Sequence, residues 1–148
     1  MTEITAKNSR LKRKHPGPRY LIDPRAFIFA LIGAPLIIGF LFFWLLIPLV
    51  AVVMGGPFYL LTATPVMLWW LGRYQPHFGA AALLGFVSNL AVVGVIYLLH
   101  LTHPSLRYDN VAEMYFTFGS IFAPIWAGAF ALLYQSWRRD AFSQPIAA

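Results

Sequence analysis

The side chains best suited to chemistry in this sequence gather around one short polar segment. His100 and His103 precede Pro104, and Asp109 and Glu113 follow it. Imidazole nitrogens and carboxylate oxygens bind divalent metals, and imidazole is also an axial ligand of haem iron. A metal site would use His103, Asp109 and Glu113. A haem or another redox cofactor would instead be held by His100 and His103.

The alternative is that these histidines hold no ligand and contact only lipid headgroups and loop carbonyls. Pro104 interrupts a helix just after His103, so the two imidazoles need not share a face. We therefore prefer this second interpretation and expect no resident cofactor.

Other reaction types lack the residues that they need. The sequence has no cysteine, which excludes disulfides, thiolate metal sites and cysteine nucleophiles. Ser105 lies near His103, but it has neither the glycine elbow nor the strand context of an acyl-transfer site. The apolar stretches contain no Asp, Glu, Lys or Arg, the groups that couple transport to protons or ions. The sequence therefore favours a protein without a catalytic reaction of its own.

The elements that must position these residues are membrane helices. Residues 26–72 contain no charged side chain, and the whole chain is 59% hydrophobic and 11% charged. A bilayer core about 30 Å thick needs roughly 20 apolar residues for each helical crossing, so this run is long enough for two crossings. An average soluble domain is about 25% charged. We therefore predict an integral membrane protein whose surface is largely covered by lipid.

The apolar stretches predict an all-α bundle of about four transmembrane helices, arranged as two hairpins. The predicted helices cover residues 26–47, 57–72, 78–101 and 114–137. Pro48 and Gly55-Gly56-Pro57 mark the first turn, and turning at Pro48 would give two helices of ordinary length. The segment 57–72 is short and contains Pro65. It either crosses the membrane fully, which we prefer, or re-enters the side from which it came.

The basic residues predict the orientation of these helices. Seven of the 11 Lys and Arg lie in a leader at residues 1–25, and four crossings would bring Arg73, Arg138 and Arg139 to the same side. Because positive residues are retained in the cytoplasm, we predict cytoplasmic N- and C-termini in a bacterial inner membrane, with a short tail at 138–148. The basic cluster from Lys7 to Lys14 adjoins a membrane segment. It can therefore bind anionic lipid headgroups, and we expect no nucleic acid.

Small residues predict where the third and fourth helices pack. Such residues let helix backbones approach closely, and in lipid this contact drives helix association. Asn89 lies deep in a predicted span, and we expect its amide to bond across the interface, to Ser120 or Thr62. The predicted packing residues are Ala81, Gly85, Asn89, Gly119, Ala123 and Ala127.

These features together favour a non-catalytic accessory or assembly subunit of a larger membrane protein complex. Its expected partners are the lipid bilayer and other membrane-protein subunits. Two alternatives remain open. One is a haem- or metal-binding redox subunit that uses His100 and His103, and the other is a carrier of a small apolar or lipid-like molecule that uses Asn89 and the kink at Pro65.

Overall fold

The computed structural model describes residues 19–42, 47–103 and 109–146 of the chain. They form the strand β1 (Arg19–Tyr20) and the helices α2 (Pro24–Leu41), α3 (Ile47–Leu71), α4 (Phe78–Thr102) and α5 (Asp109–Trp137). A short 3₁₀ helix (Asp140–Phe142) and the strand β2 (Pro145–Ile146) follow. Within this part of the chain, three helices are long and apolar enough to cross a membrane, namely Pro24–Leu41, Phe78–Thr102 and Asn110–Trp137. This agrees with the prediction of a helical integral membrane protein.

The first helix begins earlier and ends earlier than the predicted range 26–47. Asp23 is its N-cap and accepts a hydrogen bond from the Arg25 N–H, and Pro24 occupies the first turn, where its missing N–H costs nothing. At the other end, the Phe42 N–H donates to the Ile38 carbonyl at 3.2 Å. The start of the helix is therefore fixed by capping, which hydropathy alone does not reveal.

The second helix corrects the predicted range 57–72, because α3 already begins at Ile47. It runs through Gly55-Gly56-Pro57 and past Pro65 without a break in its helical backbone. Proline and glycine are tolerated in membrane helices because neighbouring helices and local adjustments compensate for the lost hydrogen bonds. Gly55-Gly56-Pro57 and Pro48, which the sequence suggested as the first turn, therefore lie within α3.

The helices α4 and α5 form a long antiparallel hairpin and make the most extensive contact in the structure. The range of α4 is close to the predicted 78–101, whereas α5 begins five residues before the predicted start at 114. In this added turn Ala112 is only 6% exposed, so the segment is packed although it is polar in sequence. The helix thus extends beyond the apolar run into a polar segment.

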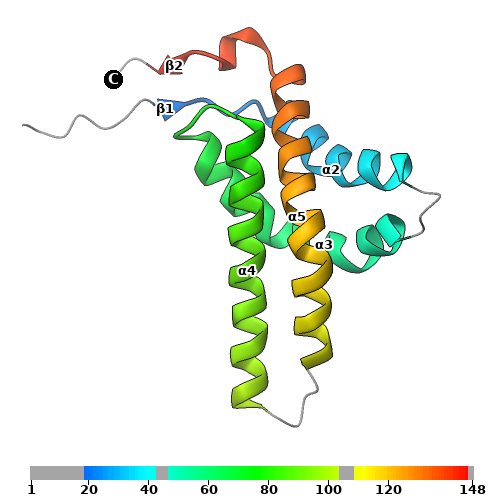
Figure 1. Ribbon diagram of the computed structural model, residues 1–148. Coiled ribbons are helices and arrows are strands. Elements are labelled where there is room, and N and C mark those ends of the chain that lie inside the picture. Colours follow the sequence, from blue (N-terminus) through cyan, green and yellow to red (C-terminus); the bar gives the residue numbers. More distant parts are fainter. Residues whose placement is uncertain (1–18, 43–46, 104–108, 147–148) are drawn as a thin grey trace, which may run out of the picture.

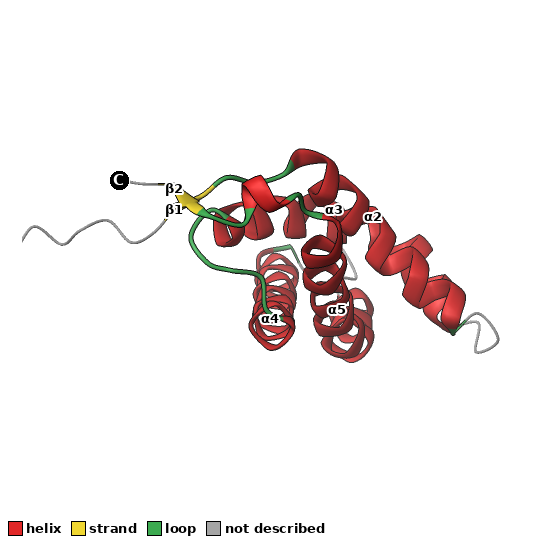
Figure 2. Cartoon of the chain, turned by 90° about the horizontal axis from the view of Figure 1, so that it is seen from above, coloured by secondary structure: helices red, strands yellow, loops and turns green. Residues whose placement is uncertain are grey.

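The first two helices do not lie parallel to this hairpin as in a regular bundle. Figure 1 shows α2 and the first half of α3 running sideways from it, and Figure 2 shows α4 and α5 end-on while α2 extends to one side. α2 packs mainly on α5, and α3 contacts α2, α5 and, to a smaller extent, α4. The predicted pair of similar hairpins is therefore replaced by one long hairpin with two helices across it.

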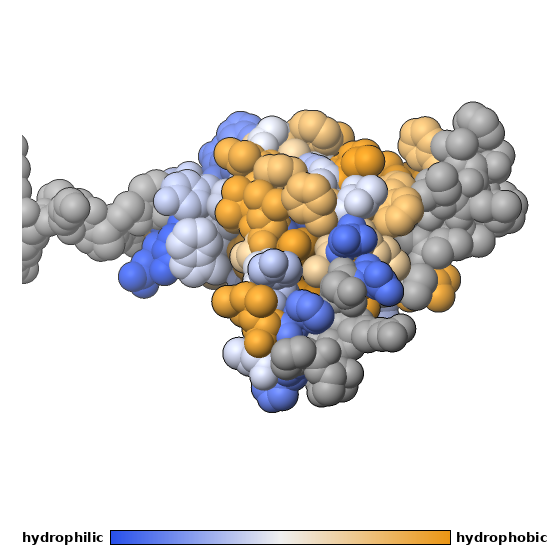
Figure 3. Space-filling view, turned by 60° about the horizontal axis from the view of Figure 1, so that its bottom comes forward, coloured by the Kyte–Doolittle hydropathy of each residue, from blue (hydrophilic) through white to orange (hydrophobic). Residues whose placement is uncertain are grey.

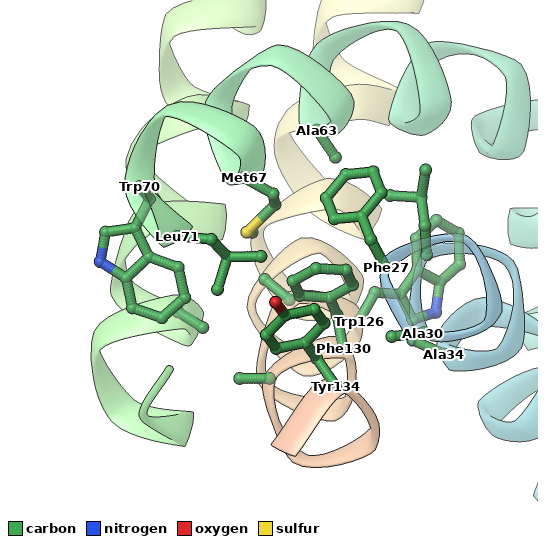
Figure 4. Close-up of a cluster of buried hydrophobic side chains, with 14 of the residues drawn as sticks. Phe27, Ala30, Ala34, Ala63, Met67, Trp70, Leu71, Trp126, Phe130 and Tyr134 are labelled. Carbon is green, nitrogen blue, oxygen red and sulfur yellow. The ribbon is translucent and has the colours of Figure 1, made fainter. Parts of the chain in front are cut away.

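The core lies where α2 and α3 cross α5 (Figure 4). The Phe27 ring meets the Phe130 ring edge-on with 5.5 Å between centroids, and Phe130 stacks on Tyr134 at 6.0 Å. Tyr59 of α3 makes a second edge-on contact with Trp126 of α5, at 5.3 Å. Ring pairs of this geometry add to the packing of the apolar surface, so α5 is the helix around which the core is built.

Three segments that are distant in sequence meet at one end of the molecule. β1 pairs with β2 in an antiparallel arrangement, with Arg19 opposite Ile146 and Tyr20 opposite Pro145. The Tyr20 N–H also donates to the Gly72 carbonyl at 3.2 Å. We call this the arginine end, because its segments carry Arg19, Arg25, Arg73, Arg138 and Arg139.

Candidate functional site

An ion pair between a buried Asp23 and an exposed Arg139 links the start of α2 to the end of α5 at the arginine end. Asp23 is only 1% exposed, and its Oδ2 accepts a hydrogen bond from Nε of Arg139 at 2.9 Å. The Arg139 backbone N–H also donates to Oδ2 at 3.3 Å, and the Arg25 N–H donates to Oδ1 at 3.1 Å. One carboxylate therefore caps the start of α2 and holds the chain just after α5.

This pairing keeps the carboxylate ionised. The hydrogen bond from the Arg139 guanidinium lowers the pKa of Asp23 below its ordinary value of 3.8, and this outweighs desolvation, which raises it. The Asp23 backbone N–H donates to the Tyr134 hydroxyl at 3.1 Å, which ties the same turn to the core. This cluster was not among the sites predicted from the sequence. Its only sequence signal is Asp23 directly before Pro24, a pattern typical of a helix start.

An open hollow lies beside the ion pair, between the start of α2 and the end of α5. Its volume is about 550 Å³. The rings of Phe29 and Trp137 form one side, edge-on with 5.8 Å between centroids. The residues that line the hollow are Arg25, Ala26, Phe29, Ser136, Trp137 and Arg139. Guanidinium, hydroxyl and aromatic groups in one hollow are suited to binding an anionic amphiphile.

The histidines and acids predicted to form a cofactor or metal site lie at the opposite end of the α4–α5 hairpin. His100 is half-buried in the last turn of α4, and its Nδ1 has no hydrogen-bond partner among the residues described. His103 follows the helix as its C-cap, and its Nδ1 lies 3.0 Å from the Thr102 hydroxyl. Glu113 is exposed on α5, and the side chain of Asp109 lies outside the described part of the structure.

In the part of the chain that the structure describes, which does not include the side chain of Asp109, these residues show no metal-ligand cluster. Within it, no three side chains of His, Cys, Asp or Glu lie together in a way that could hold a metal ion. Nδ1 of His103 contacts the Thr102 hydroxyl, whereas Nδ1 of His100 is buried and has no hydrogen-bond partner among the residues described. The metal site of His103, Asp109 and Glu113 therefore stays a prediction.

The six predicted packing residues all lie on the facing helices α4 and α5. Ala81, Gly85 and Asn89 are the buried residues of α4. On α5, Ala127 is buried, and Gly119 and Ala123 are half-buried. The structure thus places both groups of residues in or beside the closest helix contact of the molecule.

The polar group in this contact is Asn89. Its Nδ2 donates to the Tyr115 carbonyl at 3.3 Å, where the sequence had suggested Ser120 or Thr62 as partners. The amide also lies directly over Gly119, where a Cβ would come within 2.7 Å of the Asn89 Cγ. The bond therefore requires a backbone acceptor and a residue without a side chain opposite the amide. Such an arrangement holds two helices together and contains no group that could react.

The basic cluster from Lys7 to Lys14, which was predicted to bind anionic lipid, lies outside the described residues. Comparison of the chain with protein-family models, curated proteins and solved structures found no match. The function must therefore be argued from the geometry alone.

Proposed function

We propose that the protein is a non-catalytic accessory or assembly subunit of a larger complex in a bacterial inner membrane, with both termini in the cytoplasm. The observation that carries this proposal is the surface of α4. Only three of its 25 residues are buried, and all three face α5. The other faces of α4 are left for lipid or for another membrane helix.

The exposed surface is broad and apolar. Figure 3 shows large hydrophobic areas on the face seen there, separated by smaller hydrophilic ones. On α4, the small exposed residues Ala91 and Gly94 lie between the bulkier Val87 and Leu98, which are 52% and 62% exposed. A Cβ at Gly94 would meet no other atom within 4 Å. Small residues of this kind allow a second helix to approach closely, which supports a partner helix at this position.

The test is to replace Gly94 by Leu in the full-length protein and to measure the size of its complex by native gel electrophoresis of membranes in a mild detergent. We expect Gly94→Leu to release the protein from its complex, because the added side chain would separate two helix backbones. Its melting temperature after purification should not change, since no described atom lies near the added group.

The matched control is Gly79→Leu, because Gly79 is also exposed on α4 and has no atom within 4 Å of an added Cβ. This variant should leave the complex intact. A wild-type protein that migrates alone under the same conditions would contradict the proposal.

One observation keeps the redox alternative as a second candidate. Nδ1 of His100 is buried without a hydrogen-bond partner among the described residues, and an imidazole nitrogen can serve as an axial haem ligand. An absorbance spectrum and metal analysis of the purified protein distinguish the two functions. Stoichiometric haem or metal that is lost in the double variant His100→Ala/His103→Ala would favour the redox subunit over the accessory subunit.

A further inference from the structure

We propose that the hollow at the arginine end binds one anionic phospholipid. The lipid phosphate would lie between the guanidinium groups of Arg25 and Arg139. The glycerol and the first part of an acyl chain would cover Phe29 and Trp137. This site is independent of the function proposed above, because it requires no protein partner.

The charges of the hollow match a phosphodiester. The Arg25 guanidinium has no ion pair or hydrogen bond among the residues described, although its backbone N–H is bonded to Asp23. Arg139 is 60% exposed and uses Nε and one terminal nitrogen on Asp23. The Arg139 guanidinium also lies over the Phe142 ring, 4.8 Å from the centroid, and its other terminal nitrogen has no hydrogen-bond partner among the residues described. Arg25 and Arg139 carry two positive charges and Asp23 carries one negative charge, so the three groups together have a net charge of one positive unit. A phosphodiester carries one negative charge and would neutralise it.

The apolar side of the hollow distinguishes a lipid from a free anion. Phe29 is 62% exposed and Trp137 is 49% exposed, yet their rings are held edge-on by each other. An inorganic phosphate would bind the two arginines and leave these rings uncovered. A phospholipid would contact both the two arginines and the two rings.

The position of the hollow agrees with the depth of a lipid headgroup. It lies where α2 begins and α5 ends, and both helices are long and apolar enough to cross a membrane. Tryptophan and arginine are enriched where membrane helices leave the hydrocarbon core. The arginines therefore stand at phosphate level, with Phe29 one turn further into the apolar part of α2.

The test is native mass spectrometry of the full-length protein in a neutral detergent, titrated with phosphatidylglycerol and, separately, with phosphatidylcholine. We expect one phosphatidylglycerol to bind more tightly than phosphatidylcholine. Arg25→Gln should weaken the binding of phosphatidylglycerol by about tenfold, because one charge-assisted contact is lost. This variant keeps the backbone N–H that caps Asp23, so its melting temperature should equal that of the wild type.

The control is Arg73→Gln. Arg73 belongs to the same end, but it lies over the Trp69 ring, 4.9 Å from the centroid, and does not line the hollow. The Arg73→Gln variant should therefore bind phosphatidylglycerol as tightly as the wild type does. Phe29→Ser should weaken the binding of phosphatidylglycerol through the loss of apolar contact alone.

Four outcomes would overturn the proposal. The first is equal binding of both lipids to the wild type. The second is an Arg25→Gln variant that binds phosphatidylglycerol as the wild type does. The third is an Arg73→Gln variant that loses as much affinity for phosphatidylglycerol as Arg25→Gln, because the lipid would then be attracted to the arginine end as a whole. The fourth is complete displacement of the lipid by millimolar inorganic phosphate together with normal binding by Phe29→Ser, which would assign the hollow to a free anion.

Discussion

Asp23 is the residue on which the arginine end depends. Its carboxylate accepts hydrogen bonds from the side chain of Arg139 and from backbone N–H groups of Arg139 and Arg25. Its own N–H bonds the Tyr134 hydroxyl in the core. Removal of one partner from such a buried cluster leaves the others unsatisfied, which costs more than the bond itself contributes.

The first prediction concerns the pH dependence of stability. Since the folded-state pKa of Asp23 is lowered, its stabilisation is fully present above the unfolded value of about 3.8 and is lost as the pH falls through the lower folded value. Asp23→Asn should therefore melt roughly 5 °C lower than the wild type at pH 7. The difference in melting temperature between Asp23→Asn and the wild type should shrink as the pH falls below 3.8. Melting curves in detergent between pH 7 and pH 2 measure it, and a constant difference over this range would contradict the role of the carboxylate.

A second prediction at this scale tests the contact between Asn89 and Gly119. In Gly119→Ala the new Cβ would collide with the Asn89 amide and displace it from the Tyr115 carbonyl, so the free energy of unfolding should fall by about 1–3 kcal/mol. Asn89→Ala removes the colliding group and should by itself lower the free energy of unfolding by about 0.6 kcal/mol or more. The double variant should then be more stable than Gly119→Ala alone. Simple addition of the two losses in a double-mutant cycle would refute the contact.

At the scale of elements, the closest approach is that of α4 to α5. A Cβ at Gly85 would lie 2.6 Å from both the Ala123 carbonyl oxygen and the Ala127 Cβ. Backbone atoms cannot move away as a flexible side chain can, so this position requires glycine. The same helix carries Gly94 in open space, so Gly85 and Gly94 serve different purposes.

The third prediction compares these two glycines. Gly85→Ala should lower the free energy of unfolding by about 1–3 kcal/mol because it separates the two helices. Gly94→Ala introduces the same methyl group without a contact and should be neutral or slightly stabilising, since alanine favours the helix. Thermal melts of both purified variants provide the measurement. Equal melting temperatures would show that α4 and α5 do not approach as closely as described.

At the scale of the whole molecule, the strand pair and the ion pair place both ends of the membrane domain together. β1 precedes α2, β2 follows α5, and the two strands are hydrogen-bonded. The turn after α3 joins them through the Gly72 carbonyl. The histidines lie at the other end of the α4–α5 hairpin, so the molecule has one basic end and one end with little charge among its described residues.

The fourth prediction concerns the orientation proposed from the basic residues. The native chain has no cysteine, so single cysteines can be introduced without a background. Ser143→Cys at the arginine end should be protected from an impermeant thiol reagent on intact cells. His103→Cys at the far end should react. Labelling of Ser143→Cys in intact cells, with protection of His103→Cys, would reverse the orientation.

The sequence by itself determined that this is a helical membrane protein. The apolar runs without charge are a local property, and the cost of exposing an unbonded backbone in lipid leaves helices as the structure that they form. The small residues of the third and fourth predicted helices are local as well. Their spacing of four places them on one helix face, and the structure has all six of them on the facing pair α4 and α5.

The tertiary structure alone decided the start of α3 and the direction of α2 and α3. Gly55-Gly56-Pro57 has the composition of a turn, but whether it forms one depends on what compensates for the lost hydrogen bonds. Hydropathy also cannot show that helices cross instead of lying parallel, because lipid-facing and protein-facing residues are equally apolar. That distinction comes from Ala30 and Ala34 of α2, which are fully buried in the core cluster that includes Phe130 of α5.

The hollow and the ion pair likewise exist only in the folded chain. Asp23 and Arg139 are 116 residues apart, and their hydrogen bond follows from the packing of α2 on α5. No spacing in the sequence predicts a pair so distant. The sequence specified the charges at each end of the helices, and the packing of those helices decided which charges meet.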